Sequence, residues 1–222
     1  MFLNKKRNLV FIALFFLIAI VFNLITHVFD NKYYGYDANG AGGVCSISLK
    51  QAEETRCLIS GFEFYKDQLY TPDELTAQQP IPDTIIDIGR YKGFELDDPN
   101  GDPHGSGTYR LLVLLEPEER SYALDLPEIF SSYRLYVNGS LLVENGNPEK
   151  ASYQPEIIST VATFQAANQA EIVLQVADYS HYYSGMIYPP AFGTATAVQK
   201  LVNTRNFVSN CAMVFALLIA ML

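Results

Sequence analysis

One apolar segment near the N-terminus constrains this chain more than any other feature. A basic cluster at residues 5–7 precedes it, and the apolar run covers residues 9–25, with Asn23 as the polar interruption. Extended to Val28, the segment has twenty residues. As a helix it would be about 30 Å long, the thickness of the hydrocarbon core of a bilayer. Backbone polar groups in lipid must be satisfied internally, so we expect a helix here.

Two interpretations of residues 1–29 remain open. The apolar run is longer than that of a typical signal peptide and no A-x-A-like cleavage site follows, which favours an uncleaved transmembrane anchor. A cleaved signal peptide is the alternative. Both export the residues that follow, and the basic cluster before the helix predicts that the N-terminus stays inside.

A second apolar segment stands at the C-terminal end of the sequence. Residues 207–222 are apolar up to the last residue, with Ser209, Asn210 and Cys211 too sparse to form a polar face. We expect the start of a truncated transmembrane helix, preceded by a polar connector at residues 196–206. The alternative is an amphipathic helix docked on the domain.

The charge of the chain limits its partners. The formal net charge is −9, and the cluster at residues 5–7 contributes +3, so the remainder carries −12. Such an acidic domain is a poor match to polyphosphates, and nucleic acid is excluded as a partner. About 175 exported residues suffice for one core. Fifteen Tyr and fourteen Phe without Trp suit a β-rich domain.

Two cysteines lie in the predicted extension at residues 30–60. Cys45 and Cys57 are the pair outside the apolar segments, with eleven residues between them. In an oxidising compartment we expect a disulfide, which would contribute about 2–3 kcal/mol through loop-closure entropy.

Short strand-like runs separated by turn signals dominate the rest of the chain. The clearest is a hairpin, because Asn138 and Gly139 suit the positive-φ positions of a type I′ turn between residues 134–137 and 141–144. Alternation places Tyr122, Leu124 and Leu126 on one face of another strand. The remaining strands are expected at residues 107–115, 157–164 and 171–176. This pattern predicts a mainly β fold, a β-sandwich or jelly roll.

Four segments together carry a resemblance to a known family. They are GFEFYKDQLYTPDEL at residues 61–75, GSGTYRLLVLL at 105–115, YALDLPEIFSSYRLYVNGSLLVENG at 122–146 and EIVLQVADYSHYYSGM at 171–186. In this order they resemble the N-terminal extracytoplasmic domain of bacterial seven-transmembrane receptors with diverse intracellular signalling modules. The resemblance covers residues 61–193, and the YRLYVNG hairpin is its most specific part.

The resemblance implies a fold, a location and a role. The fold would be a galactose-binding-like jelly roll, more distantly similar to the sugar-binding domain of family 2 glycoside hydrolases. Residues 61–195 would form an extracytoplasmic sensory domain at the bacterial cytoplasmic (inner) membrane, on its periplasmic or extracellular side. A kinase or cyclase output module would follow in a full-length receptor.

Aromatic and polar residues gather after the last predicted strand of the core. Asp178, Tyr179, His181, Tyr182 and Tyr183 offer an acceptor, a titratable group and three rings before Gly185. Rings can stack on the C–H face of a sugar while polar groups fix its hydroxyls, so this loop is a candidate ligand site. The alternative is that the tyrosines only cover the edge of the sandwich.

Two arginines inside predicted strands are further candidates. Alternation puts Arg110 on the face of Thr108 and Leu112, and Arg134 lies in the first strand of the hairpin. A strand arginine can hold a carboxylate in a bidentate manner. The alternative is an ion pair with a neighbouring acid.

An acidic turn partly resembles a calcium loop. Asp98, Asn100 and Asp102 have alternate spacing, but Pro103 and Tyr109 occupy the positions that require glycine and glutamate. A Ca²⁺ site stays open as a weaker expectation beside an ordinary acidic turn, and no other cofactor or metal is indicated.

The residues favour binding over catalysis. No pair of carboxylates across a cleft, no Ser/His/Asp order and no phosphate-binding loop is evident, so we do not expect this chain to be an enzyme. We expect a sensory domain that binds a small solute, a carbohydrate or a carboxylate, and acts on adjoining membrane helices. The alternative is a membrane-anchored carbohydrate-binding or adhesion module without signalling. The expected partners are the membrane and the solute, and a homodimer is left open.

Overall fold

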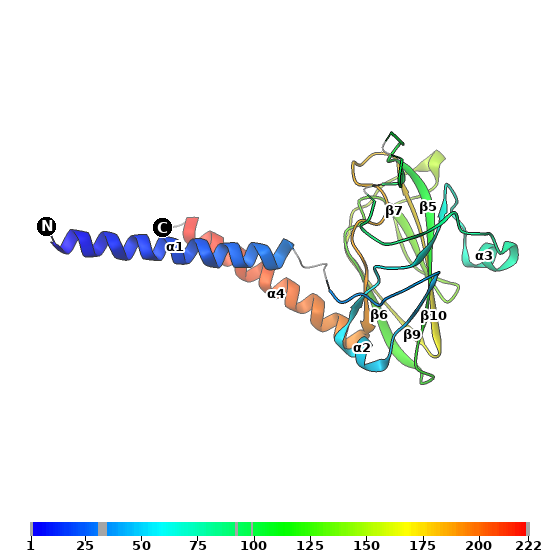
Figure 1. Cartoon of the computed structure of the whole chain (residues 1–222), viewed down its shortest axis with the longest axis horizontal. Coiled ribbons are helices and arrows are strands. Elements are labelled where there is room, and N and C mark those ends of the chain that lie inside the picture. The colour runs from blue at the N-terminus through cyan, green and yellow to red at the C-terminus, as the bar shows by residue number, and fades with distance from the viewer. Residues whose placement is uncertain (1, 31–34, 92, 99, 221–222) are drawn as a thin grey trace. The chain divides into compact units, whose positions relative to one another are not determined.

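The computed structural model describes residues 2–30, 35–91, 93–98 and 100–220. The chain divides into two units. Residues 33–199 form a compact β domain, and residues 1–32 together with 200–222 form a helical unit (Figure 1). All strands of the described part lie in the β domain.

Two long helices account for the helical unit. Among the described residues, α1 (Phe2–Asp30) is the one helix that is long and apolar enough to cross a membrane, with a mean hydropathy of 2.7 over Lys6–Ile25. A signal sequence would meet the same test, so both interpretations of residues 1–29 stay predictions. The helix α4 (Ala195–Ala220) already includes the predicted connector at residues 196–206. The second membrane span at residues 207–222 also stays a prediction.

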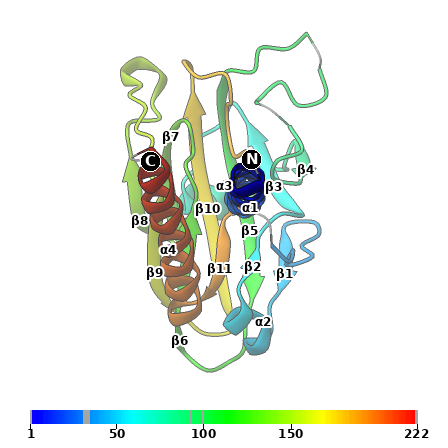
Figure 2. The same cartoon turned by 90° about the vertical axis from the view of Figure 1, so that its left-hand side faces the viewer.

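The β domain is a sandwich of two sheets. In the described part, the larger sheet has seven strands in the order β4-β3-β5-β10-β7-β8, with β1 also paired to β5, and the smaller sheet has the order β2-β11-β6-β9. All neighbours are antiparallel except β1 and β5. The strands of both sheets run roughly along one direction, as expected for aligned packing (Figure 2). The predicted mainly β sandwich is confirmed.

The bounds of the strands and short helices follow the chain. The larger sheet contains β1 (Val44–Ser46), β3 (Phe62–Lys66), β4 (Thr84–Ile86), β5 (Gly105–Leu114), β7 (Ser132–Val137), β8 (Ser140–Asn145) and β10 (Gln169–Asp178). The smaller sheet contains β2 (Arg56–Cys57), β6 (Arg120–Leu126), β9 (Thr160–Ala166) and β11 (Ala191–Thr194). The short helices are α2 (Leu49–Glu54), α3 (Pro72–Gln78) and the 3₁₀ helix η1 (Lys150–Ser152).

Alternating apolar residues of both sheets fill the space between them. Tyr122, Leu124 and Leu126 of β6 face the core together, as predicted. The ring of Tyr122 stacks on Phe192 of β11, with centroids 5.4 Å apart. The inward residues of the larger sheet include Tyr109, Leu111, Val113, Tyr133, Leu135, Ile172, Leu174 and Val176. Consequently the intervening residues of β5, β7 and β10 lie on the outer face of that sheet.

The turns explain where elements begin and end. Asn138 and Gly139 have φ angles of 47° and 80°, which is the predicted type I′ hairpin between β7 and β8. The predicted strand at residues 157–164 is shifted, because β9 begins only at Thr160. The helix α4 begins directly after β11. The hydroxyl of Thr194, the last residue of β11, accepts a hydrogen bond from the Ala197 amide at 3.3 Å and so caps the helix.

Candidate functional site

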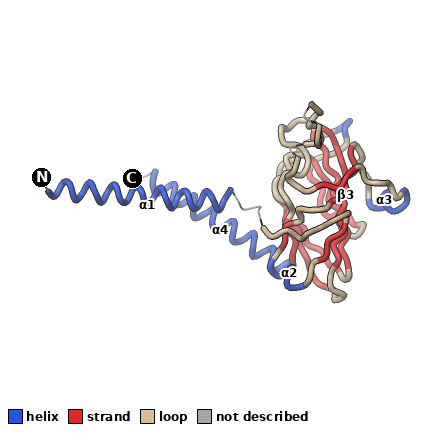
Figure 3. The backbone as a smooth tube through the Cα atoms, in the orientation of Figure 1, coloured by secondary structure: helices blue, strands red, loops and turns tan. Residues whose placement is uncertain are grey.

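A short helix lies on the outer face of the larger sheet (Figure 3). This helix, α3, begins with a capping box in which Thr71 and Glu74 bond to each other's backbone amides, and Pro72 occupies its first turn. It ends at Gln79 in the left-handed region, with φ of 46°. Pro72 and Leu75 are buried, and Leu75 packs with Tyr65 and Val173 of the sheet. The helix therefore forms a roof over β3, β5 and β10.

A pocket of about 330 Å³ opens beside this roof. Small-molecule sites usually measure roughly 300–1,000 Å³, so this volume suits a solute of monosaccharide size. The roof and the loop after it supply one wall, and the outer face of the sheet supplies the floor. The lining residues are Glu63, Tyr65, Leu75, Thr76, Gln79, Pro80, Arg110 and Glu171. Of the residues proposed from sequence, Arg110 is the one that lines this pocket.

An arginine held by two glutamates forms the polar floor. The Nε of Arg110 donates to Glu171 and its Nη1 donates to Glu63, each at 2.8 Å. Strand pairing creates this arrangement, because Glu63 of β3 lies directly opposite Arg110 of β5, and Glu171 lies on β10, which also pairs with β5. Burial alone would lower the pKa of Arg110, but the hydrogen bonds to the two glutamates outweigh it and raise that pKa. The guanidinium is therefore always charged.

A tyrosine completes the floor as a fixed donor. The hydroxyl of Tyr65 donates to the same oxygen of Glu63 that Arg110 contacts, at 3.0 Å. Burial, followed by the hydrogen bond to Glu63, raises the pKa of Tyr65 to about 12. The second oxygen of Glu63, Oε1, and that of Glu171, Oε2, accept no hydrogen bond from the residues that the structure describes. The floor thus retains acceptor capacity.

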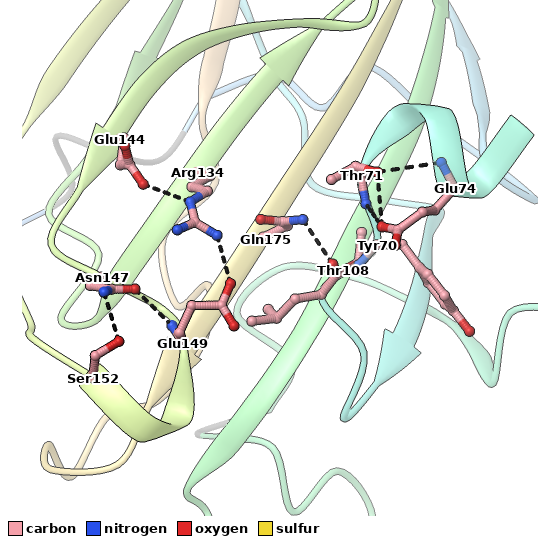
Figure 4. Close-up of polar contacts among 11 residues, drawn as sticks. Tyr70, Thr71, Glu74, Thr108, Arg134, Glu144, Asn147, Glu149, Ser152 and Gln175 are labelled. Atoms are coloured by element: carbon pink, nitrogen blue, oxygen red, sulfur yellow. Dashed lines mark hydrogen bonds and ion pairs between the residues drawn. The ribbon is translucent and has the colours of Figure 1, made fainter.

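Two buried polar side chains tie the roof to the sheet. Thr108 is fully buried, and its hydroxyl donates to the carbonyl of Gln68 at 2.7 Å and accepts from the amide of Tyr70 at 2.8 Å. Gln175, its cross-strand neighbour, donates to the carbonyl of Leu69 at 2.9 Å (Figure 4). The backbone just before α3 is therefore fixed at three points, and the pocket has a preformed roof.

Thr108→Val is expected to loosen the roof. Valine keeps the shape and the strand propensity of threonine but removes both hydrogen bonds to the loop, so the free energy of unfolding should fall by about 1–3 kcal/mol. Backbone amides of α3 should also exchange faster with deuterium. Urea unfolding and hydrogen exchange of the whole chain in detergent measure both effects. The matched control is Thr163→Val on an exposed position of β9, which should change neither; equal effects of the two substitutions would contradict the assigned role.

Arg134 lies outside the pocket. Its Nε donates to Glu144 at 2.7 Å and its Nη1 donates to Glu149 at 2.9 Å. Glu149 lies in the loop before η1, where the side chain of Asn147 accepts from the amide of Glu149 and donates to the hydroxyl of Ser152 (Figure 4). Through ion pairs with these two neighbouring acids, Arg134 joins β7 to its hairpin partner β8 and to this loop.

The loop after β10 has a buried anchor and exposed rings. Asp178 is fully buried and accepts hydrogen bonds from the amides of Ser180 and His181 and from the hydroxyls of Tyr153 and Ser184. Asp178 is therefore turned into the protein, where it fixes the loop.

The aromatic residues of this loop do lie together at the surface. His181 stacks on Phe130, with centroids 4.8 Å apart and planes 8° from parallel. Tyr182 and Tyr183 pack edge to face and remain 68% and 42% exposed. Tyr179 packs against Tyr153 instead. Phe130 and Tyr153 were not predicted, because each comes from a distant part of the chain.

The acidic turn has local hydrogen bonds. Asp98 accepts from the amide of Asn100, and Asp102 accepts from the amide of His104 and contacts the ring of His104 at 2.8 Å. Within the described ranges, no group of three His, Cys, Asp or Glu side chains could hold a metal ion. Calcium binding here remains the weaker expectation.

The predicted disulfide between Cys45 and Cys57 is wrong in this structure. Cys45 lies on β1 opposite Val113, in the larger sheet, whereas Cys57 lies on β2 opposite Ala191, in the smaller one. No disulfide joins them, and both side chains are buried. Each cysteine is placed by a strand far away in the sequence, β5 for Cys45 and β11 for Cys57, and their spacing in the sequence does not reveal this.

Cys45 is expected to be unreactive until the domain unfolds. Burial, and secondarily the charge of Asp37, raise the pKa of this thiol from 9.0 to about 12. Folding therefore favours the protonated thiol, so its contribution to stability is complete below pH 9 and is lost as the pH rises toward 12. Alkylation of Cys45 by iodoacetamide, followed by mass spectrometry, should be much faster in urea than in the folded protein. A Cys45–Cys57 peptide in a non-reducing digest would contradict this.

The fold and the pocket define a two-sheet β-sandwich domain with a small polar site on the outer face of its larger sheet. No family model and no curated protein matches the chain.

Glycosidases are among the solved structures that match the chain. A protein from Bacteroides fragilis assigned as a β-galactosidase has 16% identity and a TM-score of 0.45, with 62% of this chain and 22% of that chain covered. A β-glucuronidase from Faecalibacterium prausnitzii has 11% identity and a TM-score of 0.43, covering 62% and 31%. A family 2 β-galacturonidase from Eisenbergiella tayi has 9% identity and a TM-score of 0.41, covering 62% and 24%. The chain therefore spans less than a third of the length of each of these proteins.

Proposed function

We propose that residues 33–199 form the extracytoplasmic ligand-binding domain of a bacterial membrane receptor, and that the pocket beside α3 binds a small hydroxyl-rich solute such as a carbohydrate. The observation that carries the proposal is the preformed pocket with the Glu63–Arg110–Glu171 floor. A floor that mixes charged donors and acceptors suits hydroxyl groups, since each hydroxyl can donate and accept.

The charge arrangement disfavours a simple carboxylate ligand. Arg110 already binds two glutamates, so a third carboxylate would enter beside two like charges. Apolar surface from Leu75 and Pro80 gives the pocket a wall against which the C–H face of a ring can pack. A neutral or donor-rich ring therefore fits better than an acid.

The proposed external location of the β domain is supported by α1. The basic cluster before its apolar span favours an internal N-terminus and an external domain. An Asn138→Cys variant tests this, because Asn138 is exposed in the hairpin turn. In intact bacterial cells with a permeable outer layer, a membrane-impermeant maleimide should label this cysteine; labelling only after lysis would overturn the external location.

The receptor role rests on the helix that leaves the domain. α4 follows β11 without a break, and its residue Val198 is fully buried. A solute that binds two arrangements of this junction with different affinity would shift their populations. A binding module without signalling would leave α4 unchanged, so solute-dependent hydrogen exchange of the first turns of α4 discriminates between the two.

Solute binding is tested with a pocket-filling variant. Thermal unfolding of the whole chain in detergent is followed with glucose, galactose and other neutral monosaccharides, and a ligand must raise the midpoint with concentration. Thr76→Phe, on the pocket side of α3, should remove the effect. Gln78→Phe, exposed on the same helix but outside the pocket, is the matched control and should keep it. No stabilisation, or equal stabilisation of both variants, would overturn the proposed site.

A further inference from the structure

The pocket has a charge imbalance that no neutral solute corrects. Its charged lining residues are one arginine and two glutamates, which leaves a net charge of −1. The side chains of Glu63 and Glu171 are only 17% and 23% exposed, and that of Arg110 is 30% exposed. At such partly buried positions an unbalanced charge interacts with a ligand more strongly than it would at a fully solvated surface.

The two glutamates also keep hydrogen-bond acceptors for a ligand. One oxygen on each glutamate accepts nothing from the described residues, as shown above, while the hydroxyl proton of Tyr65 is already donated to Glu63. The hydroxyl of Thr76 likewise donates to the carbonyl of Pro72 at 3.0 Å. Arg110 uses two of its five N–H groups in these bonds, so the floor can still donate to hydroxyl groups, while its open acceptors lie on the two glutamates.

A protonated amine matches both the net negative charge and the open glutamate oxygens. An ammonium group has three donors, no acceptor and a compact positive charge, so it can bond to a glutamate oxygen and neutralise the pocket. Charge-assisted hydrogen bonds of this kind are about twice as strong as neutral ones. A carboxylate would oppose the net negative charge and could not donate to the glutamate oxygens.

We propose that this pocket selects a solute that carries a protonated amine next to hydroxyl groups, a free amino sugar, over its neutral and acidic counterparts. The inference rests on the proposed function, because it names the class of solute for the same pocket. The hydroxyl groups and the ring face use Gln79, Leu75 and Pro80 as a neutral sugar would. The amine lies on the side of the two glutamates.

Calorimetric titration of the whole chain in detergent tests the inference with sugars that differ in charge on a constant ring. One series is glucosamine, glucose, N-acetylglucosamine and glucuronate, and a second is galactosamine, galactose and galacturonate. We expect the free amine to bind about tenfold more tightly than the neutral sugar, and the acid to bind most weakly. N-acetylglucosamine has the same nitrogen without the charge and should behave as a neutral sugar.

The outcomes separate the inference from the proposed function. Equal affinities of the amine and the neutral sugar, or tighter binding of the acid, would overturn the amine preference and leave solute binding intact. Absence of binding in both series would overturn the proposed function and the inference together.

Charge-neutralising variants supply the second test. Glu171→Gln and Glu63→Gln keep the side-chain shape and remove one negative charge each, so the ratio of glucosamine to glucose affinity should fall about tenfold toward one. Glu144→Gln is the matched control, because Glu144 also pairs with an arginine but lies outside the pocket. An unchanged ratio in both pocket variants would overturn the assignment of the amine to these two carboxylates.

Discussion

Arg110→Met is expected to lower the free energy of unfolding by about 2–3 kcal/mol and to abolish solute binding in the pocket. The substitution leaves Glu63 and Glu171 as two unpaired negative charges under α3. Loss of one partner of a buried ion pair costs about 3–5 kcal/mol, and the lower value allows for the partial solvent exposure of these side chains. Urea unfolding followed by tyrosine fluorescence measures the change, since the chain has fifteen tyrosines and no tryptophan.

Arg134→Met is the matched control for this prediction. Arg134 also binds two glutamates, but Glu144 and Glu149 are 46% and 56% exposed and can be solvated when the arginine is removed. The expected loss is below about 1 kcal/mol. Equal losses for the two arginine variants would show that the pocket does not confine its charges as we infer.

A rescue experiment separates charge from packing. Addition of Glu63→Gln and Glu171→Gln to Arg110→Met removes the uncompensated charges, so most of the lost stability should return. Solute binding should not return, because the charged floor would be absent. Failure to recover stability would mean that the aliphatic part of Arg110, rather than its charge, supports the sheet.

The sandwich was predictable because its signals are local. Alternation in β6 placed Tyr122, Leu124 and Leu126 on the core side, and the Asn138-Gly139 pair specified the hairpin turn. Each of these features depends on residues close in sequence. The start of β9 was misplaced because residues 157 and 158 are isoleucines that suit a strand, yet both side chains are about half exposed outside it.

The pocket was not predictable because its floor depends on strand order. Arg110 lies 47 residues from Glu63 and 61 residues from Glu171, and only the adjacency of β3, β5 and β10 brings the three together. The sequence did carry one local signal for the roof, since Thr71, Pro72 and Glu74 have the spacing of a helix start. The disulfide was mispredicted for a similar reason, because sequence spacing says nothing about which sheet each cysteine joins.

Asp178→Ala, at the last residue of β10, is expected to lower the free energy of unfolding by about 3–5 kcal/mol, more than any single substitution in the loop that follows. The side chain is fully buried and accepts from two amides and two hydroxyls, so alanine would remove the acceptor that these four donors share. Asp178→Asn keeps one carbonyl oxygen in place and should cost less. Urea unfolding of both variants measures the difference.

Comparison with an exposed ring of the same loop shows whether Asp178 anchors the loop or contacts a ligand. Tyr182 is 68% exposed, so Tyr182→Ala should change the free energy of unfolding by less than about 0.5 kcal/mol. If Asp178 contacted a solute rather than the loop, its substitution would weaken binding without this loss of stability. We expect the reverse, because a buried carboxylate surrounded by its own loop can position Tyr182 and His181 but cannot reach a ligand. A stable Asp178→Ala variant would refute this anchoring role.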